Sequence, residues 1–113
     1  MPTAVAKKLS HISDRAGMKA REVAQLLDTA PETVSRWRSG RVEPQPDKLD
    51  RLLELDWLIE QLGELYPRPD EARLWLLSRH RLLEGDTPAN RIQKGKLSDV
   101  LALIAQLRDG AYV

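Results

Sequence analysis

A small residue, a β-branched residue and a large apolar residue stand at a fixed spacing within residues 20–39. Ala24 is followed ten positions later by Val34, and Trp37 comes three positions after Val34. A small side chain lets two helices cross closely, while the two larger side chains fill the space around the crossing. This spacing is typical of a helix-turn-helix, and it is the feature that most constrains how the chain can fold.

Apolar residues recur at helical spacing along the rest of the chain, and no stretch alternates apolar and polar side chains over six residues. We therefore expect an all-α protein, with an N-terminal helix-turn-helix bundle joined by a long helix to a small helical domain. The expected helices cover residues 3–16, 20–28, 31–39, 47–65, 70–79, 88–95 and 97–109.

Prolines mark the organisation of the chain, because a proline cannot sit in the interior of a helix. Pro44 and Pro46 stand directly before residue 47, and Pro67 and Pro69 stand directly after residue 66. They divide the chain into a helix-turn-helix region (1–46), a connecting and dimerisation helix (47–66) and a C-terminal domain (67–113). The apolar faces of residues 49–65 and 97–107 are too wide for one neighbour, and this width predicts a homodimer.

Composition excludes several kinds of function. The formal net charge is +1, with nine Lys and Arg against seven Asp and Glu in residues 1–50 and nine against ten afterwards, which argues against binding nucleic acid by bulk charge alone. Cysteine is absent, and His11 and His80 are far apart with no metal-ligand spacing beside them. No catalytic group, metal site or cofactor is expected.

The polar N-terminus resembles no signal peptide and no apolar run could span a membrane, so we expect a cytoplasmic protein.

The second helix of the motif would lie in the major groove of DNA. With Val34 and Trp37 turned inward, Arg36 is the best candidate for a bidentate contact to guanine, whereas Arg38 and Arg41 suit phosphates. The full set of expected DNA-contacting residues is Glu32, Thr33, Ser35, Arg36, Arg38, Ser39 and Arg41.

Three departures from the usual motif favour weak DNA binding or the alternative of a helical hairpin that merely packs. Asp28 stands where the turn usually has glycine, and Ala30 replaces the usual hydroxyl-bearing cap. Glu32 brings a carboxylate close to the phosphates. Affinity is therefore expected to be modest, or to need a dimer.

The second half carries a sparser pattern: Trp75, Leu83, Gly85, Pro88, Gly95 and Val100. Together with the helix-turn-helix, this pattern resembles the bacterial antitoxins called Xre, MbcA and ParS, over nearly the whole chain from Ala16 to Val113. The segments around Trp75 and over residues 82–88, with the ending 110–113, are most similar to the MbcA branch.

The resemblance implies a partner toxin with a RES domain, which destroys NAD, held within a larger complex. It also implies that the C-terminal domain binds this toxin, that the C-terminal tail closes the toxin's active site, and that the helix-turn-helix represses the operon through operator DNA. The implied toxin-binding residues are Trp75, Arg79, His80, Arg81, Gly110, Ala111, Tyr112 and Val113.

Plainer interpretations exist for each of these residues. Trp75 is more often a core residue than a contact. The basic cluster 79–81 is as readily a solvated helix end, and the last four residues can be a frayed terminus. A free-standing helix-turn-helix repressor, whose C-terminal half only dimerises, is the alternative function. A helical enzyme is the remotest alternative, because the carboxylates at 70–71 and 84–86 are explained by helix starts and loops.

Replacing Arg36 with alanine tests the expected position of the recognition helix. Loss of one bidentate base contact should cost about 1–3 kcal/mol of operator binding and relax the preference at one base pair. Titration of operator DNA at fixed salt measures the effect, and unchanged affinity would refute the assignment of this helix.

Overall fold

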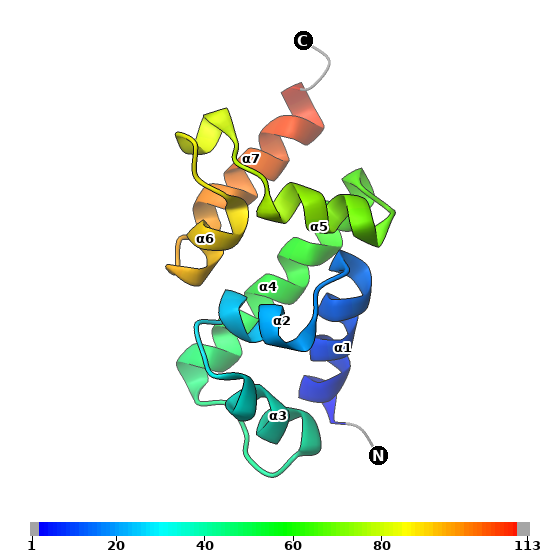
Figure 1. Cartoon of the computed structure of the whole chain (residues 1–113), viewed down its shortest axis with the longest axis vertical. Coiled ribbons are helices and arrows are strands. Elements are labelled where there is room, and N and C mark those ends of the chain that lie inside the picture. The colour runs from blue at the N-terminus through cyan, green and yellow to red at the C-terminus, as the bar shows by residue number, and fades with distance from the viewer. Residues whose placement is uncertain (1–2, 111–113) are drawn as a thin grey trace.

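The computed structural model describes residues 3–110, which form helices and connecting turns with no strand, and this confirms the expected all-α fold (Figure 1). None of the helices in this range is long and apolar enough to cross a membrane. The elements are α1 (Ala4–Ala16), α2 (Ala20–Leu26), α3 (Pro31–Ser39), α4 (Pro46–Leu65), α5 (Pro69–Leu77), the 3-10 helix η1 (Arg81–Leu83), α6 (Pro88–Gln93) and α7 (Leu97–Gly110).

Short-range signals set where the helices begin and end. The Thr3 hydroxyl caps α1 by accepting a hydrogen bond from the Ala6 backbone N–H at 3.0 Å, and Thr87 caps α6 in the same way. Proline occupies the first position of α3, α4, α5 and α6, where its missing N–H costs nothing. Gly17 ends α1 in the left-handed region, with φ of 62°.

Four helices end at residues other than those expected, and one of them is α6, which ends at Gln93. Helix α2 stops at Leu26 because Asp28 adopts a left-handed conformation with φ of 53°. Helix α5 stops at Leu77, since Ser78 is extended and its hydroxyl donates to the Leu74 carbonyl at 2.5 Å. Gly110, expected in the tail, is the last residue of α7.

Helix α4 runs through the centre of the molecule and packs against α1, α5 and α7 (Figure 1). Leu52, Leu55, Leu58 and Leu62 of α4 are fully buried in a single core that also includes residues of α1, α2, α5 and α7. Both halves of the chain therefore bury their apolar side chains against the same helix.

The close approach of Gly17 to α5 gives a test of this packing. A Cβ at Gly17 would lie 2.9 Å from the Pro69 carbonyl oxygen, whereas a Cβ at Gly85, which also has positive φ, would meet nothing within 4 Å. Gly85→Ala should therefore lose about 1–2 kcal/mol of unfolding free energy from backbone strain alone, and Gly17→Ala should lose clearly more. Denaturant unfolding of the two variants makes the comparison, and equal losses would contradict the contact between α1 and α5.

Candidate DNA-binding and partner-binding surfaces

Helices α2 and α3 pack through the three residues whose spacing predicted them. Ala24, Val34 and Trp37 are at most 4% exposed, so all three point inward as expected. The turn between the helices is closed by a 3.0 Å hydrogen bond from the Thr29 N–H to the Ala24 carbonyl. Asp28 takes the left-handed conformation that glycine usually supplies at this turn.

Lys48, which was not expected to matter, supports this turn from the start of α4. Its ammonium group donates to the carbonyl oxygens of Leu27 (3.0 Å) and Asp28 (2.8 Å), two acceptors beyond the end of α2. A cation at this position also offsets the negative end of the helix dipole. Only the fold brings Lys48 here, because twenty residues separate it from Asp28.

The expected DNA-contacting residues lie together on the outer side of α3 and in the turn that follows. Six of the seven are exposed and Thr33 is half-buried. Within residues 3–110, no carboxylate lies within ion-pairing distance of Arg36, Arg38 or Arg41. The Ser39 hydroxyl donates to the Arg36 carbonyl at 3.0 Å, so it is left to act as an acceptor.

An ion pair joins the helix-turn-helix to the C-terminal half. Arg73 of α5 binds the carboxylate of Glu22 on α2 and approaches the Gly17 carbonyl at 3.4 Å. The hydrogen bond from Arg73 lowers the pKa of the Glu22 carboxyl, although partial burial opposes the shift. Glu22 also accepts from the Lys19 N–H and so caps α2, which means that one carboxylate stabilises both a helix end and the contact between the two halves.

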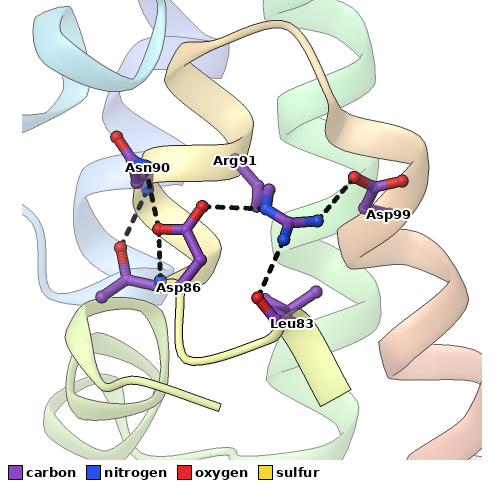
Figure 2. A network of polar contacts seen from close by, with 6 residues as sticks. Leu83, Asp86, Asn90, Arg91 and Asp99 are labelled. Carbon is purple, nitrogen blue, oxygen red and sulfur yellow. Dashed lines mark hydrogen bonds and ion pairs between the residues drawn. The ribbon is translucent and has the colours of Figure 1, made fainter. Parts of the chain in front are cut away.

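Figure 2 shows the polar network that fixes the loop between α5 and α6. Arg91 binds Asp86 and Asp99, each at 2.8 Å, and donates to the Leu83 carbonyl at 2.8 Å. Asp86 also accepts from the Asn90 side chain at 2.8 Å. The hydrogen bonds from Asn90 and then from Arg91 lower the pKa of the Asp86 carboxyl, so this carboxyl stays charged and the loop stays held.

The three residues of the basic cluster fall in different places. Arg79 and His80 lie between α5 and η1 rather than at a helix end, while Arg81 begins η1. Arg79 and Arg81 are exposed, whereas His80 is half-buried and its Nε2 lies 2.9 Å from the Trp75 carbonyl oxygen. Since a carbonyl can only accept, Nε2 is the donor.

Trp75 is a core residue in this structure. It is 6% exposed, and its ring lies 6.4 Å from that of Tyr66 and 4.8 Å from that of His80, measured between centroids. Any contact it makes with a partner is limited to the exposed edge of its ring. Of the expected tail, Gly110 is described as the end of α7, and Ala111, Tyr112 and Val113 lie outside the described residues.

An apolar groove runs between α4 and α7. Leu53 and Trp57 of α4 are 43% and 56% exposed, and they face Leu97 and Leu101 of α7 across the groove. Two large apolar side chains exposed on the same helix form an apolar patch, which is more informative than a single exposed apolar residue. Within residues 3–110, no group of three or more histidine, aspartate or glutamate side chains is placed to hold a metal ion.

Comparison with known proteins agrees with this architecture. A family model described as helix-turn-helix matches residues 14–55. The mycobacterial cidal antitoxin MbcA of Mycobacterium tuberculosis, like that of Mycobacterium bovis, is 38% identical over 109 residues, which cover 96% of each chain. A chain from the crystal structure of the M. tuberculosis MbcT–MbcA toxin–antitoxin complex superposes with a TM-score of 0.81 at 37% identity, covering 98% of this chain and 99% of that one.

Proposed function

The chain belongs to the family of mycobacterial cidal antitoxins, and on that premise we propose that it is the antitoxin of a toxin–antitoxin pair, which binds and neutralises its partner toxin. The observation that carries this proposal is the extent of the likeness to a chain of a toxin–antitoxin complex. That likeness covers the C-terminal half as well as the helix-turn-helix, so it includes the part of the chain that a DNA-binding protein would not need.

The partner we propose is a RES-domain toxin that degrades NAD, and the tail from Gly110 to Val113 is its inhibitor. The resemblance of residues 75–113 to the MbcA branch supports this assignment. A tyrosine between small and apolar neighbours can fill a pocket at little cost in entropy. The role is one of binding, with no catalytic step on this chain.

The helix-turn-helix is proposed to repress the operon that encodes the pair, with α3 in the major groove. The exposed arginines of α3 and the packing of α2 on α3 support this role. Helix α3 and the end of α7 lie at opposite ends of the long axis (Figure 1), so operator DNA and a toxin could be bound at the same time. The two proposed targets, operator DNA and a toxin that acts on NAD, place the action of the protein in the cytoplasm.

The α4–α7 groove is proposed to hold a second copy of the chain. Trp57 is exposed on this surface and also lines the groove. In a two-fold dimer the same surface of each copy faces the other, so Trp57 of one copy can enter the groove of the second copy and the reverse. A two-fold dimer matches a palindromic operator and would raise the modest affinity expected from a single motif.

Deleting Ala111–Val113 tests the inhibitory tail while leaving every described helix complete. The truncated chain should keep the melting temperature of the full chain but should no longer protect NAD when mixed with the toxin encoded beside its gene. Purified toxin, NAD and either form of the chain suffice for the measurement. If the truncated chain protects NAD as well as the full chain does, the tail is not the inhibitor.

Replacing Trp57 with serine tests the proposed dimer, with Leu82→Ser as a matched control because Leu82 is similarly exposed at 58%. Loss of a large aromatic anchor should weaken self-association roughly tenfold or more, whereas the Leu82 variant should associate like the parent. Sedimentation equilibrium over a concentration series reads out both. A parent chain that is monomeric at high concentration, or a Trp57 variant that dimerises normally, would contradict the proposal.

A further inference from the structure

A small apolar hollow lies between the end of α4 and the outer face of α5. It is lined by Tyr66, Glu71, Leu74, Trp75, Ser78 and His80 and has a volume of about 270 Å³. Sites that hold small molecules usually measure about 300–1,000 Å³, so this hollow suits one side chain better than a cofactor. Leu74 at its rim is 68% exposed, more than any other large apolar residue in residues 3–110.

Two of the polar groups that line the hollow, on Ser78 and His80, are already engaged within the chain, whereas the carboxylate of Glu71 is exposed. The Ser78 hydroxyl donates to the Leu74 carbonyl at 2.5 Å, and Nε2 of His80 donates to the Trp75 carbonyl at 2.9 Å. The surface that remains for contact with a partner side chain consists mainly of the rings of Tyr66 and Trp75 and the side chain of Leu74. The hollow therefore favours an apolar side chain. A polar side chain would lose its hydration on entering, and the two donors are already bonded within the chain.

The hollow and the end of α7 both lie near the end of α4. Arg108, two residues before Gly110, binds Gln61 (2.7 Å) and Glu64 (3.2 Å), so the end of α7 lies against the last turns of α4. Tyr66 follows that same turn and forms one wall of the hollow. The hollow and the point where the tail leaves α7 thus both lie beside the last turn of α4.

The short reach of the proposed tail links its binding to the surface around the hollow. The proposed inhibitory residues 111–113 come directly after Gly110, and a fully extended stretch of three residues spans at most about 10 Å. A protein that takes these residues into its active site must therefore press its own surface against the ends of α4 and α7. An exposed apolar feature beside that contact is where such a surface would gain affinity by removing apolar area from water.

We propose that this hollow is a docking socket, in which Leu74 and the rings of Tyr66 and Trp75 receive an apolar side chain from the toxin that also takes the tail. The inference rests on the proposed antitoxin function and deepens it, because it separates affinity, supplied by the socket, from inhibition, supplied by the tail. It also moves the centre of the expected contact from Trp75, which forms the floor of the socket, to Leu74.

Three variants of the full chain test the socket by titration against the toxin encoded beside its gene. Leu74→Asp places a charge at the rim and should weaken toxin binding roughly tenfold or more, as loss of a central apolar contact does. Leu74→Met keeps an apolar side chain and should bind within about twofold of the parent. Val42→Asp makes the same chemical change at a 49% exposed residue beside α3 and should bind like the parent.

The outcomes separate the two levels of the proposal. If the parent chain does not bind the toxin at all, both the proposed function and the socket fail. If the parent binds and Leu74→Asp binds equally well, or if Val42→Asp weakens binding as much, the socket is wrong and the antitoxin function stands. If Leu74→Asp instead abolishes self-association in sedimentation while toxin binding is unchanged, the hollow serves a second copy and the proposal is overturned.

Discussion

Burial around the central helix α4 is the interaction on which the rest of the structure depends. Its fully buried leucines face α1 on one side and α7 on another, and α5 packs near its end. Each leucine removed from water contributes about 1.5–3 kcal/mol, so this one helix accounts for much of the gain that offsets chain entropy. The helix-turn-helix and the C-terminal half are therefore fixed to one rod rather than joined by a flexible linker.

A rod with different surfaces at its two ends suits a protein with two partners. The exposed face of α3 lies at one end of the long axis and the end of α7 at the other (Figure 1). Between them, the α4–α7 groove leaves a third surface free. The ion pair between Glu22 and Arg73 and the network around Arg91 add specificity to this arrangement, because each joins segments that the apolar core alone would position less tightly.

Much of this architecture follows from local patterns in the sequence. Helical periodicity, prolines and glycines predict the helices, and the spacing of Ala24, Val34 and Trp37 predicts how α2 packs on α3. The positions of Lys48 and Arg73 could not be predicted, since Arg73 meets Glu22 across 51 residues of sequence. The hollow beside Leu74 was missed although its lining lies within residues 66–80, because its walls come from α5 and the segments on either side of it, and only their packing in three dimensions forms the cavity. The site residues themselves remain predictions, and the experiments above address them.

The central claim is that this chain neutralises a toxin by binding it, and the most direct measurement is the NAD content of cells that express the proposed partner toxin, with and without this chain. The account predicts that NAD falls when the toxin is expressed alone, stays near its normal level when the full chain is coexpressed, and that the two proteins purify together. A fall in NAD of the same size with the chain present, and no complex on purification, would contradict it.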